Sequence, residues 1–285
     1  MIFAVLCKGD GISKERLFLT SVVKNLQTGL RAAGFAVSPD GQFGTNTENA
    51  VKAFQTTEHV ETSGIVNKTT WTQLSPHLQS TVGVNQSKVR ELLRNFDGDL
   101  SWVHEREGHR GTAYWPGGAS GVTLDPGVDL GQVGSETIQA FYGTLLTEEQ
   151  RGGILNVIGL KGAAAKSALD NSPTLRTIRI GKEDAERIMP LVSQRYWDNI
   201  VNRFPALVAA NILPSVQTVL LSLSYNRGSQ NQDLEQLRVP LNAGDWGDLA
   251  RKTGAMQQDH ELEGIRIRRR MEADLMRAEV EYIQS

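Results

Sequence analysis

The sequence predicts a mainly α-helical protein with one small β-hairpin, divided into a small N-terminal domain and a larger C-terminal domain. Apolar residues recur at helical spacing over most of the chain. A Gly-rich stretch at 111–131 carries turn signals around short extended pieces, a pattern typical of a hairpin. A polar stretch at 75–87 lacks periodicity and indicates a connection between domains. We therefore expect domains at 1–80 and 91–285, joined by a linker at 81–90.

Composition excludes several classes of protein. The chain has 285 residues, with 30 Lys and Arg against 32 Asp and Glu, so it lacks the positive excess of a protein that coats nucleic acid. Cys7 is the only cysteine, which excludes an internal disulfide and a zinc site with two thiolates. The apolar run at 2–7 is too short for a signal peptide and predicts a buried strand or extended arm. No stretch approaches the ~20 apolar residues that span a bilayer, so we expect no membrane insertion.

Three short helices are predicted in the N-terminal domain. The first follows Thr20 and Ser21 and ends at Gly34. Residues 45–47 cap the second, and the third contains Trp71. Because three short helices bury little apolar surface, aromatic side chains must supply much of the core. We expect these to be Phe43, Phe54 and Trp71.

A dense motif crosses this domain. From residue 40 to residue 55 it reads DGQFGTNTENAVKAFQ, and it continues with Gly64-Ile65-Val66 and Thr70-Trp71. Over residues 20 to 75 this pattern resembles the peptidoglycan-binding domain of cell-wall hydrolases, with Ser63 standing where the family often has Asp. The resemblance implies non-catalytic attachment to the bacterial cell wall.

Four residues of this domain are candidates for binding the wall. Phe43 either lies in the core, which we favour, or forms a platform for the ligand. Asp40 either contacts sugar or forms a turn, which we favour because an Asp side chain can cap its own turn. Binding would then fall to polar groups expected at the surface, such as Thr47 and Gln55.

The C-terminal domain carries the candidate chemistry, beginning with two glutamates. A short helix capped by Asp99 or Ser101 is predicted to end at Gly108. Glu105 and Glu107 are two residues apart and face opposite ways, so one of them can point into a given cleft. Glu107 is at the negative end of the helix dipole, which disfavours a charged carboxylate and suits a general acid.

The same region does not predict a metal or phosphate site. His104 and His109 are five residues apart, whereas the zinc-protease motif spaces its histidines four apart on one helix face. The Gly-rich stretch at 111–131 lacks the Lys-Ser/Thr pair of a phosphate loop, and its polar groups include Thr123, Asp125 and Asp129. We expect no metal and no cofactor.

A helix-end Glu facing a hairpin Asp supplies the two carboxyl groups that glycosidic cleavage requires.

These residues also resemble a known family. The resemblance covers roughly residues 90 to 285 and rests on these segments: Glu107-Gly108, Tyr114, 120–123, Gly127, 129–131, 224–228 and 269–272. It is to the phage-type lysozyme superfamily, in the branch that contains the bacteriocin pesticin. The family's fold would make this an α+β lysozyme-like domain with a small β-hairpin sheet beside the active-site cleft.

Several site residues follow from that resemblance. Glu107 matches the catalytic acid, Thr123 a water-positioning residue, and Asp129 the base or electrostatic partner. The second carboxylate of better-known phage lysozymes would stand at Pro116, where this chain has none, so Asp129 takes the role and Asp125 is its rival. Tyr114, Tyr225 and Asn226 are expected to bind substrate, although Tyr225 also lies at the spacing of a helix core.

Longer helices are expected in the rest of the chain. They span 183–197, with a break or kink at Pro190, 215–225 and 262–282. The last carries a cluster of four arginines: Arg266, Arg268, Arg269 and Arg270. We expect a solvated helix face there, and the alternative is contact with anionic outer-membrane lipid.

Together these features predict a monomeric endolysin that hydrolyses the β-1,4 bond between N-acetylmuramic acid and N-acetylglucosamine and lyses its host. Its partner would be peptidoglycan. The protein would be made in the cytoplasm without a signal peptide and act on periplasmic peptidoglycan, with a holin implied for exit from a Gram-negative host. The alternatives are a lytic transglycosylase and a non-catalytic wall-binding structural protein.

Overall fold

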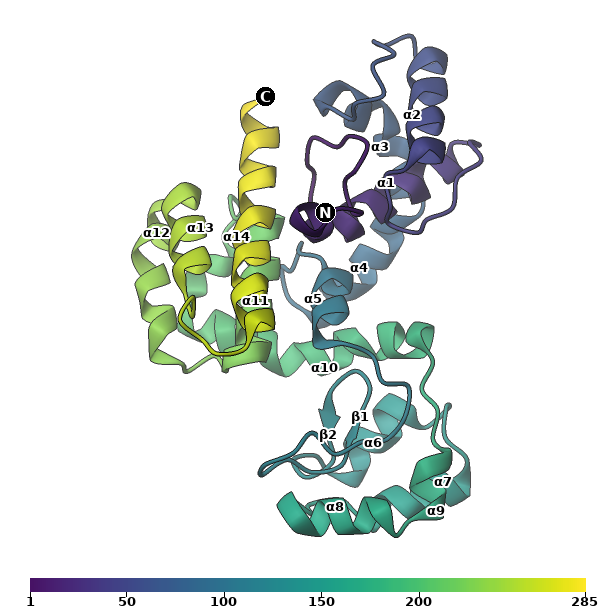
Figure 1. Cartoon of the computed structure of the whole chain (residues 1–285), viewed down its shortest axis with the longest axis vertical. Helices are drawn as coiled ribbons and strands as arrows, with labels where there is room; N and C mark the ends of the chain where they lie inside the picture. Colours follow the sequence, from purple (N-terminus) through teal and green to yellow (C-terminus); the bar gives the residue numbers. More distant parts are fainter. The chain divides into compact units, whose positions relative to one another are not determined.

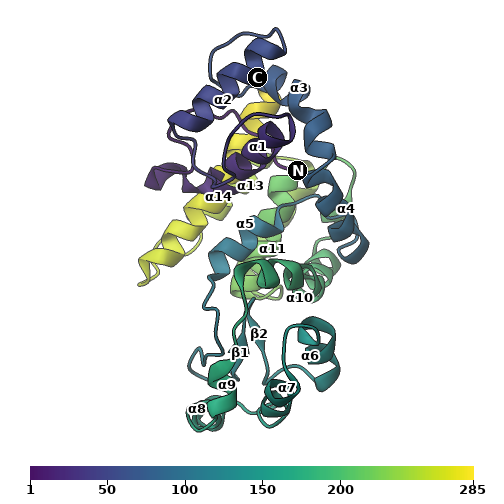
Figure 2. The ribbon, with the colours of Figure 1, turned by 90° about the vertical axis from the view of Figure 1, so that its right-hand side faces the viewer.

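The computed structural model describes the backbone of all 285 residues and every side chain except that of Val84. The chain folds into two compact units, one formed by residues 1–103 with 195–285, the other by residues 104–194 (Figure 1; Figure 2). Helices dominate both units, and the described residues contain one two-stranded antiparallel sheet. The predicted mainly α-helical fold with a small hairpin is confirmed.

The helices of the first unit come from both ends of the sequence. They are η1 (Lys14–Leu19), α1 (Thr20–Ala32), α2 (Thr45–Thr57), α3 (Lys68–Gln79), α4 (Val82–Leu92), η2 (Pro205–Val208), α11 (Pro214–Arg227), η3 (Gln232–Leu237), α12 (Arg238–Ala243), α13 (Trp246–Ala255) and α14 (Glu263–Gln284). The second unit contains β1 (Thr123–Leu124), β2 (Val128–Asp129), α6 (Ser135–Tyr142), α7 (Glu148–Leu155), α8 (Gly162–Asp170) and α9 (Pro173–Thr177). Two helices pass from one unit to the other: α5 (Leu100–Glu107) and α10 (Lys182–Arg203).

The three predicted N-terminal helices are α1, α2 and α3. The buried face of α1 includes Val22, Val23, Leu26 and Leu30. Gly29 lies where α1 packs on α3, and a Cβ atom there would come within 2.9 Å of Leu78. A side chain at residue 29 would therefore force Leu78 or Leu74 to shift.

The N-terminal segment is an extended arm, as predicted. Leu6 forms an isolated antiparallel bridge with Val66, with N–O distances of 3.0 and 2.9 Å. The indole nitrogen of Trp71 donates to the Ala4 carbonyl at 2.8 Å. The Phe3 ring lies between Trp71 and Tyr282, at centroid distances of 5.2 and 5.6 Å. The arm therefore joins the three-helix region to α14 of the same unit.

The segment 81–90, predicted as a linker, is mostly helical. Helix α4 covers almost the whole segment and packs against α3 and α1. The Gln86 amide donates to the Phe96 carbonyl at 2.9 Å. A polar segment with a weak apolar pattern becomes helical here because tertiary packing supplies stability that its own periodicity does not reveal. The functional boundaries at 1–80 and 91–285 stay a prediction.

Proline does not break the helix at 183–197. Helix α10 runs without interruption from Lys182 to Arg203 through Pro190. A proline removes one backbone hydrogen bond, which a 22-residue helix can lose without ending. The other two long helices predicted in this half are confirmed as α11 and α14.

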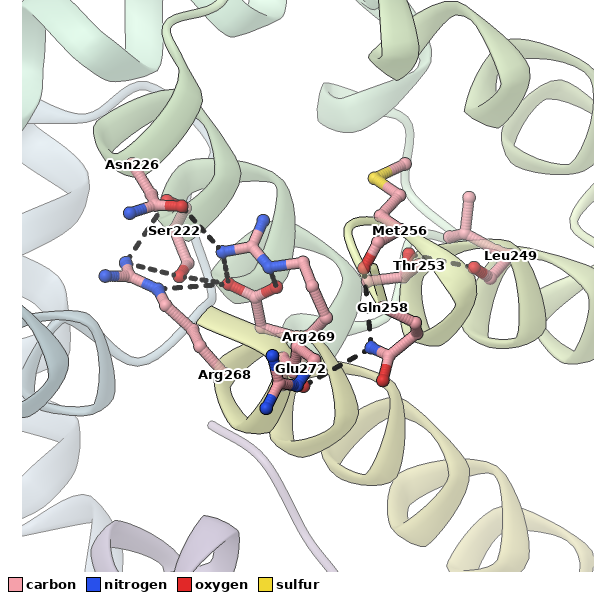
Figure 3. A network of polar contacts seen from close by, with 10 residues as sticks. Ser222, Asn226, Leu249, Thr253, Met256, Gln258, Arg268, Arg269 and Glu272 are labelled. Atoms are coloured by element: carbon pink, nitrogen blue, oxygen red, sulfur yellow. Dashed lines mark hydrogen bonds and ion pairs between the residues drawn. The ribbon is translucent and has the colours of Figure 1, made fainter. Parts of the chain in front are cut away.

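The C-terminal arginine cluster is not uniformly solvated, contrary to the prediction. Arg269 is 0% exposed and Arg268 9%, whereas Arg270 is exposed. Both buried guanidinium groups meet the carboxylate of Glu272, which is also 0% exposed, between α11 and α14 (Figure 3). Helix α11 is buried all round from Ser215 to Ser224, so α14 must bury its polar groups where it packs against that helix.

Among the described residues, no helix is both long and apolar enough to cross a bilayer.

Candidate functional site

The small sheet of the second unit aligns three of the predicted site residues. Strands β1 and β2 pair antiparallel with Thr123 opposite Asp129. Tyr114 forms a bridge on the other side of Thr123, with N–O distances of 3.0 and 2.7 Å. Residues directly opposite each other in a sheet project to the same face. Tyr114, Thr123 and Asp129 therefore form one row across this sheet.

The Asp129 carboxylate is held in place by backbone groups. Its Oδ1 accepts from the Gly121 N–H at 2.9 Å and the Gly131 N–H at 2.8 Å, and its Oδ2 accepts from the Gln132 amide at 2.9 Å. A Cβ atom on Gly121 would lie 2.4 Å from Oδ1, so the approach requires glycine. Asp129 is half-buried. The structure thus presents a fixed carboxylate at the end of β2.

Thr123 is more enclosed than its neighbours in the row. Its side chain is 3% exposed, and its hydroxyl donates to the Gly121 carbonyl oxygen at 3.4 Å. Gly121 is thus the shared neighbour of the Thr123 hydroxyl and the Asp129 carboxylate. The role of Thr123 in positioning water stays a prediction.

Glu107 is the last residue of α5, as predicted. The N-terminus of this helix is capped by Asp99, whose Oδ1 accepts from the Trp102 N–H at 3.0 Å. Gly108 follows Glu107 with a φ of 77°, a conformation that favours glycine and ends the helix. Glu107 is half-buried at this helix end.

Tyr114 lies within electrostatic reach of Glu107. Burial raises the pKa of the Tyr114 hydroxyl, and the carboxylates of Asp125 and Glu107 raise it further. The Arg110 guanidinium, 4.7 Å from the Tyr114 ring centroid, acts in the opposite direction. Tyr114 therefore stays a neutral phenol at physiological pH.

Asp125, the rival second carboxylate, anchors a loop. It is 2% exposed, and its Oδ2 accepts from the Arg110 and Gly111 N–H groups and lies 3.2 Å from His109 Nδ1. Its main-chain carbonyl accepts from the Tyr142 hydroxyl at 2.8 Å. These contacts explain why a buried carboxylate is tolerated here and give it a structural role.

Asp125→Ala is expected to destabilise the protein by about 2–4 kcal/mol, because buried N–H groups lose a charged acceptor. Chemical denaturation followed by circular dichroism would measure the change. The matched control is Asp170→Ala on α8, an exposed residue paired with Lys166, which should change stability by less than about 1 kcal/mol. Equal stability of the Asp125 variant and wild type would contradict the anchoring role.

His104 belongs to the same neighbourhood and is buried. Its side chain is 2% exposed, and burial lowers its pKa, so the imidazole is neutral at pH 7. Its ring lies 6.4 Å from that of His109, edge to face. No group of three His, Cys, Asp or Glu side chains that could hold a metal ion is found among the described residues.

Tyr225 and Asn226 lie on α11, which belongs to the first unit. The Tyr225 ring stacks on that of Tyr196 at a centroid distance of 3.9 Å. Asn226 is exposed, and its Oδ1 accepts from Arg269 Nη2 at 3.0 Å (Figure 3). The structure thus groups Tyr225 with Asn226, and groups Tyr114, Thr123 and Asp129 separately. That all five contact one substrate stays a prediction.

The wall-binding residues predicted at the surface are mostly buried. Phe43 is 0% exposed, which confirms it as core, but Thr47 at 2% and Gln55 at 0% contradict the expectation of exposed polar groups. The Gln55 amide donates to the Ile65 carbonyl at 2.8 Å and to Thr70 Oγ1 at 3.0 Å, and its oxygen accepts from the Gly64 N–H at 2.9 Å. A buried amide is stable there because each of its polar atoms has a partner.

Gln27, which was not among the predicted binding residues, holds the preceding loop through its side-chain amide as Gln55 holds the loop at Gly64. Its amide nitrogen donates to Asp40 Oδ1 at 2.8 Å and to Thr47 Oγ1 at 3.0 Å, and its oxygen accepts from the Gly41 N–H at 2.8 Å. The two loops share a spacing that could have revealed this, since Thr47 follows Gly41 by six residues and Thr70 follows Gly64 by six. One arrangement of glutamine, glycine and threonine thus shapes both loops of the domain.

A cavity of about 710 Å³ opens beside the first of these loops. It lies between the end of α1, the segment 36–42 and the start of α2. Of the four predicted wall-binding residues, Asp40 and Thr47 line it. Asp40 is exposed, and its Oδ1 also accepts from the Gln42 N–H at 2.8 Å, so it forms the predicted turn.

Comparisons with known proteins bear on the N-terminal region. No curated protein matches the chain. Among solved structures, the crystal structure of Burkholderia AP3 phage endolysin is 16% identical over 99% of both chains, with a TM-score of 0.22. A TM-score this low does not establish a shared spatial arrangement. Residues 20–74 match the family described as "Putative peptidoglycan binding domain". The prediction of such a domain over residues 20 to 75 is confirmed, and the chain carries a peptidoglycan-binding domain of this family near its N-terminus.

Proposed function

We propose that the chain is a modular endolysin that hydrolyses the β-1,4 bond between N-acetylmuramic acid and N-acetylglucosamine in peptidoglycan. The observation that carries the proposal is the row of Tyr114, Thr123 and Asp129 on the small sheet, in the same unit as Glu107 at the end of α5. Two carboxyl groups on independent supports, a helix end and a hairpin, suit glycosidic cleavage. The peptidoglycan-binding domain supports peptidoglycan as the polymer on which this chemistry acts.

Each residue has a defined part in the proposed reaction. Glu107 donates a proton to the oxygen of the scissile bond as the bond to the anomeric carbon breaks. Asp129 accepts a proton from the attacking water or stabilises the positive charge on the sugar ring. The Thr123 hydroxyl, directly opposite Asp129 in the sheet, holds that water. By resemblance to the pesticin branch we favour inversion, which corresponds to carboxyl groups ~6.5–9.5 Å apart rather than ~5–5.5 Å.

Product analysis of digested peptidoglycan tests the reaction. Wild-type protein should release muropeptides with reducing ends, whereas 1,6-anhydro ends would identify a lytic transglycosylase and overturn hydrolysis. Asp129→Asn should reduce the rate by roughly 100- to 10,000-fold. Asn keeps the oxygen that accepts from Gly121 and Gly131, so the loop should remain folded. Asp170→Asn on α8 is the matched control and should retain activity.

A non-catalytic wall-binding protein is the second candidate, favoured by the match of the N-terminal domain alone. Folded protein that sediments with purified walls but releases no muropeptide would support it.

For the endolysin we also propose a cellular setting. The protein would act as a monomer on periplasmic peptidoglycan of a Gram-negative host, after leaving the cytoplasm through a holin.

A further inference from the structure

We propose that the cavity at the start of α2 binds a zwitterionic amino acid group of the peptidoglycan stem peptide, with its carboxylate against Arg31 and its ammonium group against Asp40. This inference rests on the proposed function only in taking peptidoglycan as the ligand. It assigns the wall-binding domain a part of the polymer, the peptide, and leaves the glycan strand to the catalytic unit.

Two opposite charges line the cavity without pairing with each other. Arg31 is in the last turn of α1 and is exposed, and it makes no ion pair or hydrogen bond with any described side chain. Asp40 uses Oδ1 to accept from Gln27 and from the Gln42 N–H, and no described group bonds to its Oδ2. Both charges are therefore available to groups of a ligand.

The rest of the lining favours a small polar ligand with an apolar portion. Ala36 and Val37 provide an apolar wall, and Ser38 and Thr45 provide hydroxyl groups. The volume of about 710 Å³ is within the range of small-ligand sites, roughly 300–1,000 Å³. The first turn of α2, capped by Gly44 without a side-chain hydrogen bond, adds N–H groups that favour an anion.

The cavity is also preorganised. Gln27 is 1% exposed and fixes Asp40, the Gly41 backbone and Thr47 through four hydrogen bonds that also include the Gln42 carbonyl. Because the anionic side chain is held before binding, little ordering entropy is lost when a ligand enters.

Charge chemistry selects the stem peptide as the occupant. Its diamino acid residue carries a free carboxylate and a free ammonium group a short distance apart. The sugars of the glycan strand are neutral, and the lactyl carboxyl is consumed in the amide bond to the peptide. A site with one unpaired cation and one unpaired anion therefore matches the peptide better than the glycan.

The test uses the full chain carrying Glu107→Gln, so that walls remain undigested, and measures binding by calorimetry and sedimentation. The probes are a synthetic stem tripeptide ending in diaminopimelate, the same peptide with amidated carboxyl groups, and walls with or without their peptides. We expect binding to the free peptide and to intact walls. Amidation of the peptide, or its removal from the walls, should weaken binding at least about tenfold, the factor that 1.4 kcal/mol represents.

Arg31→Gln and Asp40→Asn should each produce a similar loss, and Asn retains the oxygen that bonds to Gln27 and Gln42. Lys68→Gln, on the exposed face of α3, is the matched control and should bind as before. Equal binding to walls without peptides, or wild-type affinity of both cavity variants, would overturn the inference. Failure of wild-type protein to release muropeptides would count against the hydrolase and leave this binding result intact.

Discussion

Glu107→Gln is expected to abolish release of muropeptides from purified walls while leaving the unfolding temperature unchanged. Loss of a positioned general acid reduces a rate by roughly 100- to 10,000-fold. Glutamine has nearly the same shape as the half-buried Glu107 but carries no acidic proton that it could transfer to the leaving oxygen. Dye release from labelled walls would give the rate, and thermal unfolding by circular dichroism would report the fold.

The matched control is Glu105→Gln on the same helix. Glu105 is two residues away and faces the other side of α5, with its carboxylate 3.6 Å from Arg106. Its variant should keep activity within a few-fold of wild type. Comparable loss of activity in both variants would show that charge in this helix matters generally, and substantial activity in the Glu107 variant would remove it as the acid.

Glu272→Gln is expected to produce the largest loss of stability, about 3–5 kcal/mol, because it leaves buried arginines without their counter-charge. The Glu272 carboxylate lies 3.0 Å from Arg269 Nε and 3.4 Å from Arg268 Nε, and it accepts from the Ser222 hydroxyl at 2.6 Å. Figure 3 shows these groups converging between α11 and α14. Urea denaturation would measure the free energy of unfolding.

Two further variants separate the charge from the packing. Glu281→Gln is the same substitution at an exposed position of α14 and should change stability by less than about 0.5 kcal/mol. The double variant Arg269→Met with Glu272→Leu should be less destabilised than the sum of the two single changes, since it removes both buried charges together. Additive effects would contradict direct coupling between Arg269 and Glu272.

Local patterns in the sequence predict much of the fold. The three N-terminal helices follow from apolar spacing, caps and Gly34. The hairpin follows from the turn at Asp125-Pro126-Gly127, and its register places Thr123 opposite Asp129. Turn chemistry and periodicity act between near neighbours, so one sequence can reveal them.

The failed predictions about polar side chains depend on partners far away in the sequence. Gln55 and Thr47 look like surface residues, yet Thr70 and Gln27, 15 and 20 residues away, satisfy their side chains in the core. The arginines of α14 look solvated in the sequence. In the structure Arg268 is buried, and its guanidinium group donates to the hydroxyl of Ser222 on α11, 46 residues away.

The sequence by itself therefore determined the helical class, the hairpin and the peptidoglycan-binding domain, because these depend on local spacing and a dense motif. Only the tertiary structure decided which polar residues are buried, that residues 82–92 form a helix, and that the N-terminal arm packs against Tyr282. The physical reason is that a polar or charged side chain can be buried only where distant groups bond to it, and those groups come together when the chain folds.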